Sequence, residues 1–267
     1  MGPVGLLLST PLTVCLVVIS KRVPQLEFLT VMLGDEPVLG PKSRFYQRLL
    51  ALDREEAADL LAREMSNKSL MEVCDTVLIP TLRMATFDNQ CGMLEAKRAA
   101  FVFACLRALI SNLGSRNKAA DQDPQSRNIM ILSLPVLSEP DELAALLFVK
   151  LLQSEGVSAQ PATFGDLKAQ IDVWCKSNQL IVCLSAISPS ATESARRLVK
   201  PIRRQFPELP ILVGLWNAAD EGKMDSGDLQ ATGANQVVTT LQEGLDAILK
   251  WLPISSHNAE MPATRLS

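Results

Sequence analysis

Five runs of apolar residues in the second half of the chain constrain its fold more than any other feature. The longest apolar stretches among them do not alternate with polar residues, which is typical of parallel strands buried on both faces. They cover residues 129–134, 158–162, 180–184, 211–214 and 236–238. Stretches with helical patterning fill the intervals, at 140–154, 164–176, 189–205, 226–231 and 240–251. Since crossovers between parallel strands are right-handed, we predict one parallel sheet with helices on both faces and the strand order 2-1-3-4-5.

The turn after the first strand is the corner at which a ligand would be expected. In open, flavodoxin-like α/β sheets of this kind, ligands bind beyond the carboxyl ends of the strands. Here the turn reads Val-Leu-Ser-Glu-Pro-Asp-Glu over residues 136–142. Ser138 is predicted to begin the next helix with Pro140 in its first turn, and Gly156 to end it. Asp141 and Glu142 are adjacent and point about 100° apart on a helix, so they fit helix capping better than acid/base chemistry.

Three common uses of such a sheet need residues that this corner lacks. A dinucleotide site needs Gly-x-Gly-x-x-Gly after the first strand, and the turn contains no glycine. A phosphoacceptor receiver needs an aspartate after the third strand, where Ser185 stands. A hydrolase needs Gly-x-Ser-x-Gly around that serine, and Leu184 and Ala186 do not match it. With no base to activate it, Ser185 is expected to form hydrogen bonds, so we predict no catalytic residue and no enzyme.

Composition excludes two further classes of function. The chain has 26 Lys and Arg and 29 Asp and Glu, for a formal charge of −3, so the charge balance does not point to a nucleic-acid surface. Its six cysteines include no CxxC pair, and its one histidine is His257. A zinc site needs several clustered thiolates or imidazoles, so we predict no metal site. Scattered, reduced cysteines are typical of a cytoplasmic environment.

The first 20 residues carry no charged side chain and are followed at once by Lys21 and Arg22. A membrane span needs about 20 apolar residues, so we predict a membrane segment over 1–22. The basic pair places the rest of the chain on the cytoplasmic side of the inner membrane. Residues 2–13, Gly-Pro-Val-Gly-Leu-Leu-Leu-Ser-Thr-Pro-Leu-Thr, resemble the end of the membrane region in the autoinducer-2 exporter (PerM-like) family. Residues 23–39 are similar to the segment that leaves the membrane in bacterial members with long cytoplasmic tails.

The remaining boundaries follow from local breaks in the pattern. A connecting segment covers 23–41, and a small helical bundle is predicted over 42–114, with capping starts at Asp53 and Ser69 and a kink at Pro80. The polar stretch 115–127 is predicted to be a linker between this bundle and the α/β domain of 128–252. Residues 253–267 form a tail.

The helical bundle and the α/β domain together resemble a cobalamin-binding domain with its helical cap. Residues 78–97 are similar to the cap, in which a proline, an aromatic residue and a glycine precede a glutamate–histidine pair. Pro80, Phe87 and Gly92 match the first three, whereas the pair is replaced around Ala99 and Ala100.

Three motifs of that family have counterparts at the ends of the predicted strands. The cobalt-ligating histidine after the first strand is replaced at or near Pro140. The serine motif that lines the slot for the nucleotide tail corresponds to Ser185, Ala186 and Ile187. The glycine pair after the fourth strand keeps Gly214, and Leu215 is expected to crowd the slot. The resemblance therefore implies a degenerate ligand slot formed by Ser185, Ala186, Ile187 and Gly214, and we predict no cofactor because the histidine is missing.

These observations lead to two functional hypotheses of different classes. The first is a non-enzymatic, membrane-associated protein: the C-terminal part of an exporter-like transporter with a regulatory or interaction module. It would contact the membrane through residues 1–22, and it leaves open a homo-oligomer or a partner subunit. The alternative is a soluble sensor that binds a corrinoid or a nucleotide-like ligand.

Overall fold

The computed structural model describes residues 40–113, 129–162, 169, 171, 179–188, 191–216 and 226–252. Contacts divide the chain into two compact units, Met1–Arg44 and Phe45–Ser267. The predicted membrane segment 1–22, the linker 115–127 and the tail 253–267 lie outside the described residues, as does all but the end of the connecting segment. None of the helices that the structure describes is both long enough and apolar enough to span a membrane. Membrane attachment through residues 1–22 therefore stays a prediction.

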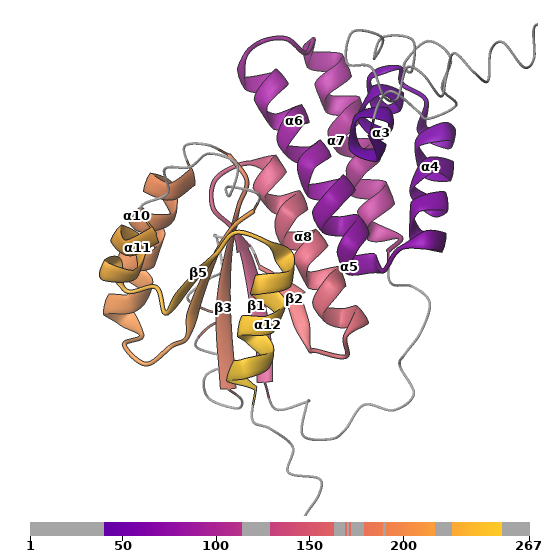
Figure 1. The fold of residues 1–267 in the computed structure, drawn as a ribbon. Coiled ribbons are helices and arrows are strands. Elements are labelled where there is room, and N and C mark those ends of the chain that lie inside the picture. Colours follow the sequence, from indigo (N-terminus) through magenta and orange to yellow (C-terminus); the bar gives the residue numbers. More distant parts are fainter. Residues whose placement is uncertain are drawn as a thin grey trace, which may run out of the picture. The chain divides into compact units, whose positions relative to one another are not determined.

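The second unit contains the predicted parallel sheet (Figure 1). All four neighbouring pairs of strands are parallel, and the order β2-β1-β3-β4-β5 confirms the predicted order 2-1-3-4-5. The register pairs Ser133 with Cys183 and Ser185 with Gly214. The strands are β1 (Ile129–Pro135), β2 (Ala159–Pro161), β3 (Gln179–Ala186), β4 (Ile211–Leu215) and β5 (Gln236–Val238).

Alternation along the strands sends side chains into two separate apolar clusters, one on each face of the sheet. Ile131, Cys183 and Leu212 belong to the cluster that includes helices α8 (Glu139–Ser154) and α12 (Leu241–Trp251). Their strand neighbours, such as Leu132 and Val182, belong to the cluster with α10 (Ala191–Gln205) and α11 (Ser226–Thr232). Burial on both faces explains why the central strands β1 and β4 are almost continuously apolar, whereas the edge strand β2 is partly exposed. The predicted helix 164–176 lies almost wholly outside the described residues.

A set of helices precedes the sheet in the chain, as predicted. Asp53 Oδ1 accepts a hydrogen bond from Glu56 N at 3.0 Å, and Ser69 Oγ accepts one from Glu72 N at 3.1 Å, which confirms both capping starts. The π-helical turn η2 ends two residues before Pro80, so the wider turn accommodates the proline without ending the helical run. The elements are α3 (Pro41–Leu50), α4 (Arg54–Asn67), α5 (Leu70–Val73), η2 (Cys74–Leu78), α6 (Ile79–Gln90) and α7 (Ala96–Ser111).

Of this set, α6 and α7 pack on α8, and η2 packs on α12, on one side of the sheet. Leu106 of α7 and Leu147 of α8 belong to the same buried cluster, which also contains Ile131 of β1. Asp75 of η2 accepts hydrogen bonds from the first backbone N–H groups of α12, from Leu241 at 2.9 Å and Gln242 at 3.2 Å. One continuous core therefore joins the helical cap, residues 45–113 of this unit, to one face of the sheet.

Candidate functional site

The corner after β1 is organised by Asp141, which is fully buried. Its Oδ2 atom accepts hydrogen bonds from the backbone N–H groups of Leu137 (3.1 Å) and Ser138 (3.0 Å) and from the Ser138 hydroxyl (2.9 Å). Its Oδ1 atom accepts one from Ile187 N at 2.8 Å, on the segment that follows β3. Asp141 therefore fixes the ends of two neighbouring strands relative to each other, and it acts as the helix-capping acid that the sequence predicts.

Glu142 takes no part in this hydrogen-bond network and pairs instead with an arginine at the surface. Its carboxylate lies 3.1 Å from Arg107 Nη2 of α7, and Glu139 Oε1 lies 3.4 Å from the same atom. All three side chains are largely exposed to solvent. Asp141 and Glu142 thus have different partners, in keeping with their predicted roles as helix-start acids.

Two serines and a cysteine form a buried polar group on the α8 and α12 face of the sheet. The hydroxyls of Ser133 and Ser185 lie 3.2 Å apart, and both residues are fully buried. Burial raises the pKa of the neighbouring Cys183 thiol to about 12, although hydrogen bonds with Ser185 and Ser133 lower it. The thiol therefore stays protonated at neutral pH, and no base activates Ser185. This group holds adjacent strands together and offers no nucleophile.

Next to this polar group, the ring of Trp216 covers Gly214. A Cβ atom built on Gly214 would fall 2.1 Å from Trp216 Cζ2 and 2.3 Å from Cη2. The indole also packs against Phe148 of α8, with ring centroids 5.0 Å apart and an interplanar angle of 41°. A Cβ on Gly244 of α12 would meet the same Cη2 atom at 3.2 Å. We call this space, bounded by Gly214, Phe148 and Gly244, the indole slot.

The predicted crowding by Leu215 is wrong. Leu215 belongs to the apolar cluster on the opposite face of the sheet, with α10 and α11. Trp216, two residues after Gly214, lies on the same face as that glycine and fills the space beside it. Sequence reasoning missed Trp216, although the two-residue repeat of a strand was a signal that could have found it.

The structure brings together only part of the predicted ligand slot. Ser185 and Gly214 are paired in register and share one face of the sheet. Ala186 points into the opposite cluster, and Ile187 contributes its backbone N–H to Asp141. Their role as ligand residues stays a prediction.

Two buried polar atoms without a partner among the described residues and an exposed leucine lie in the segments that directly follow the carboxyl ends of the strands. Ser188 Oγ follows β3 and Trp216 Nε1 follows β4, and both atoms are buried without a hydrogen-bond partner within the described part of the chain. Leu137, in the corner after β1, has 70% of its surface exposed. Phe87 on α6 of the cap is 51% exposed. A buried polar atom without a hydrogen-bond partner calls for an explanation, and contact with a bound ligand is one.

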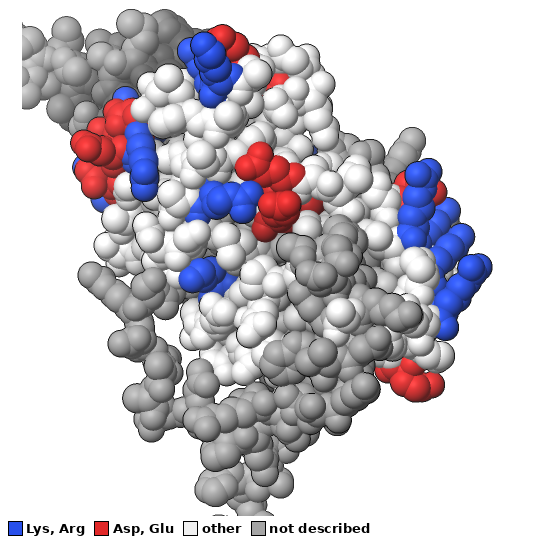
Figure 2. Space-filling view, turned by 180° about the vertical axis from the view of Figure 1, so that it is seen from behind, with Lys and Arg blue, Asp and Glu red and all other residues white. Residues whose placement is uncertain are grey.

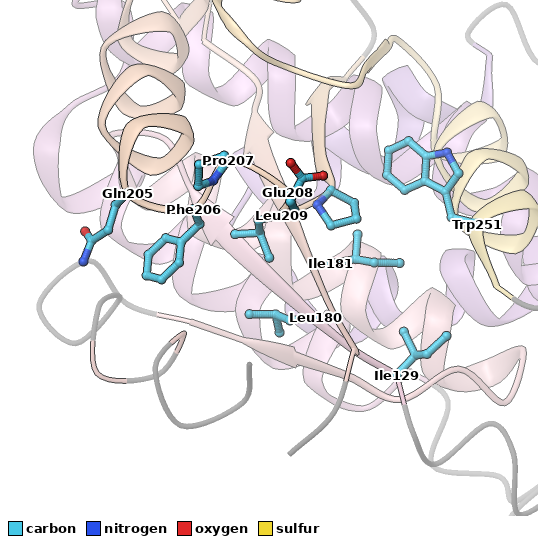
Figure 3. A pocket seen from close by; sticks show the side chains of 10 residues that line it. Ile129, Leu180, Ile181, Gln205, Phe206, Pro207, Glu208, Leu209 and Trp251 are labelled. Carbon is cyan, nitrogen blue, oxygen red and sulfur yellow. The ribbon is translucent and has the colours of Figure 1, made fainter. Parts of the chain in front are cut away.

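A cavity of about 540 Å³ lies at the other edge of the sheet (Figure 3). Ile129 and Leu180 stand at the amino ends of their strands, and the segment after α10 and Trp251 complete the lining. Ligands of open α/β sheets bind at the carboxyl ends, so this cavity is not at the expected site. The remaining lining residues are Ile181, Gln205, Phe206, Pro207, Glu208, Leu209 and Pro210.

Charge is unevenly spread over the face shown in Figure 2, where Lys and Arg gather along one edge. Helix α10 supplies a basic stripe there, in which Arg197, Lys200 and Arg204 are exposed. Glu193 lies 3.5 Å from Arg197 and 3.6 Å from Arg196, so the stripe is partly neutralised by its own helix. Among the residues that the structure describes, no three His, Cys, Asp or Glu side chains form a metal-binding group.

Comparison with known proteins relates this fold to corrinoid proteins. The monomethylamine corrinoid protein of Methanosarcina barkeri matches with a TM-score of 0.58 and 7% sequence identity, over 79% of this chain and 98% of that chain. A cobalamin-binding protein from Desulfitobacterium hafniense matches with a TM-score of 0.38 and 15% identity, over 81% and 100%. The methanol:cobalamin methyltransferase complex of Methanosarcina barkeri gives a TM-score of 0.33 and 9% identity, over 81% of each chain.

No protein-family model and no curated protein matches the sequence. At 7% identity the first structural match shows the fold alone, and it supports the α/β, flavodoxin-like, cobalamin-binding-like architecture. These comparisons give no support to the exporter resemblance of residues 2–13 and 23–39. The transporter hypothesis is therefore still a prediction.

The prediction that the chain has no cofactor is contradicted, because the fold that it shares is that of a protein named as a corrinoid protein. The residues fit one mode of corrinoid binding better than another. The described residues include no histidine, and Trp216 fills the space beside Gly214. A corrinoid held through a histidine and through an inserted nucleotide tail does not fit these residues. A corrinoid that brings its own axial base, or has none, requires neither feature.

Proposed function

We propose that residues 45–252 form a binding module for a corrinoid, or for a nucleotide-like ligand of similar size, at the carboxyl ends of the strands. The protein supplies no axial histidine, and the ligand does not insert its base into the sheet. The module binds its ligand and does not transform it. The corrinoid would bring its own cobalt chemistry, and this chain's residues would hold and orient it.

The proposal rests on the groups found at the carboxyl ends of the strands. The fold around them matches a corrinoid protein over 98% of that protein's chain. Asp141 holds the loops after β1 and β3 in place through four hydrogen bonds. Beside this rigid corner, Leu137 exposes an apolar side chain and Ser188 has a buried hydroxyl without a partner. A large, flat ligand would cover the Leu137 side chain and would offer a hydrogen-bond partner to the Ser188 hydroxyl.

The absence of catalysis is part of the proposal and follows from how the reactive groups are engaged. Both oxygens of Asp141 accept hydrogen bonds from structural donors. The Ser185 hydroxyl bonds to Ser133, and the Cys183 thiol is protonated at neutral pH because burial raises its pKa to about 12. None of these groups is free to move a proton or attack a substrate.

Equilibrium dialysis of the full chain against hydroxocobalamin and against cobinamide, which lacks the nucleotide, tests the proposal. We expect both to bind with similar affinity, cobalamin to keep the absorption spectrum of its base-on form, and the melting temperature to rise with ligand concentration. The Leu137→Asp variant should bind more weakly. Leu249→Asp, which changes an exposed leucine of α12, is the matched control and should bind as the wild type does. If neither corrinoid binds, the corrinoid proposal fails.

A further inference from the structure

The two glycines beside Trp216 have no backbone reason to be glycine. Among the described residues, the glycines with positive φ are Gly92, Gly156 and Gly233, so Gly214 and Gly244 have conformations that any residue adopts. Gly214 lies in β4 and Gly244 lies inside α12, where glycine is less stable than alanine. Gly214 is required instead by the flat ring, because any Cβ there would overlap the indole, and a Cβ on Gly244 would lie in tight contact with Phe148 and the indole.

The indole slot fits the shape of the Trp216 ring but provides no hydrogen-bond partner for its Nε1 atom. Trp216 is 1% exposed, and its Nε1 atom has no hydrogen-bond partner in the described structure. Phe148 and the two glycines are apolar neighbours of the six-membered ring. A buried indole N–H without a partner is unfavourable, so the contacts of the flat bicyclic ring must offset that loss.

We propose that Trp216 is a built-in occupant of a slot for a planar bicyclic base, and that it determines which ligands the domain accepts. The ligand part of this inference rests on the proposed function, since Gly214, which bounds the slot, and Ser185, which pairs with it in register, belong to the predicted nucleotide-tail site. With the indole in place, the slot excludes the base of an incoming ligand. Without it, the same space accepts a base of the size of benzimidazole.

The slot itself can be tested without any corrinoid. Replacing Trp216 by glycine removes the ring and leaves an apolar cavity of matching shape, which should bind free indole and 5,6-dimethylbenzimidazole. We expect each compound to raise the melting temperature of Trp216→Gly saturably by several degrees, and to leave the wild type unchanged. Trp251→Gly is the matched control, because Trp251 is half-buried and lines the open cavity at the opposite edge. It should show no saturable rescue.

A second variant keeps the test decisive if Trp216→Gly does not fold. Trp216→Leu retains an apolar side chain that fills only part of the slot, and it should still gain binding of 5,6-dimethylbenzimidazole over the wild type in equilibrium dialysis. If the folded variants at position 216 bind neither compound, or if Trp251→Gly responds equally, the slot is no specific site for a bicyclic base and the inference is overturned.

The corrinoid experiment separates this inference from the proposed function. The wild type should bind cobalamin and cobinamide alike, whereas Trp216→Leu should prefer cobalamin by about tenfold, with cobalamin shifting to its base-off spectrum. A wild type that binds cobalamin base-off would overturn the exclusion by Trp216 while supporting corrinoid binding. A wild type that binds neither corrinoid would remove the proposed function, and the free-base experiment would still decide the inference.

Discussion

At the scale of single residues, Asp141 is the side chain on which the geometry of the corner depends. It is buried, and its two oxygens accept four hydrogen bonds from two different loops. In Asp141→Asn, an amide NH2 group would replace one of the two carboxylate oxygens, so it would face backbone N–H donors that need an acceptor. We expect a loss of about 2–3 kcal/mol in the free energy of unfolding, because buried donors are left without an acceptor.

The adjacent acid provides the control for that measurement. Glu142→Gln weakens an exposed ion pair with Arg107 and should cost less than about 1 kcal/mol. Urea denaturation of both variants gives the comparison. Equal effects at positions 141 and 142 would mean that the buried network does not hold the corner.

Cysteine reactivity provides a second prediction at this scale. Burial raises the pKa of Cys183 to about 12, and that of Cys74 is raised as well, chiefly by burial and further by Asp75. Cys91 is exposed. Because only thiolates react readily, brief alkylation of the native protein at pH 8 should modify Cys91 and leave Cys74 and Cys183 intact, as peptide mass mapping would show. Modification of Cys183 at the rate of Cys91 would contradict its burial.

The residues at the corner also show how far the sequence can predict a site. Ser138 and Pro140 predict the start of α8 because both residue types favour helix N-termini, and the structure confirms that start. The two-residue repeat of a strand could have placed Trp216 on the same face as Gly214, but not beside Gly244, which is far along the chain and is brought near by the packing of α12 on the sheet. Local signals therefore predict where an element begins, whereas the contents of the space between elements depend on contacts that the sequence does not display.

At the scale of elements, the start of α12 is completed by a residue from the cap. Asp75 accepts hydrogen bonds from Leu241 N and Gln242 N, and Thr240 Oγ1 accepts one from Glu243 N at 3.2 Å. Three of the N–H groups that a helix start leaves unpaired are thereby satisfied. Desolvation raises the pKa of Asp75 and the charge of Glu243 raises it further, although the two backbone hydrogen bonds lower it.

The raised pKa fixes the sign of a pH effect on stability. Since the folded-state pKa of Asp75 lies above the ordinary value of 3.8, its contribution to stability is fully present below that value and is lost as the pH rises through the folded pKa. As the pH rises above about 4, the wild type should therefore lose unfolding free energy relative to the Asp75→Asn variant.

Asp75→Ser can still cap the helix but has no ionisable group, so it should lose the same pH dependence. Urea titrations at several pH values between 3.5 and 7 would measure both variants. A pH-independent difference for either one would contradict the raised pKa.

At the scale of the whole molecule, strand order and class of fold followed from the sequence, but the joining of cap and sheet did not. The continuous apolar runs of β1 and β3 predict a doubly covered parallel sheet, and the structure has it. The predicted boundary between a helical bundle and an α/β domain marks a change of composition. In space, Leu106 of the cap and Ile131 of the sheet share one buried cluster, because α7 packs on α8.

A shared core predicts that the cap and the sheet unfold together. All three tryptophans, Trp174, Trp216 and Trp251, lie in the α/β part of the sequence, so their fluorescence reports on that part alone. Leu106→Ala removes a fully buried side chain of the cap, which should cost about 2–5 kcal/mol. If the core is cooperative, this cap substitution should lower the urea midpoint measured by tryptophan fluorescence as much as the midpoint measured by circular dichroism. A fluorescence midpoint equal to that of the wild type would instead show that the cap unfolds independently, and a ligand bound at the carboxyl edge would then have to organise the two parts.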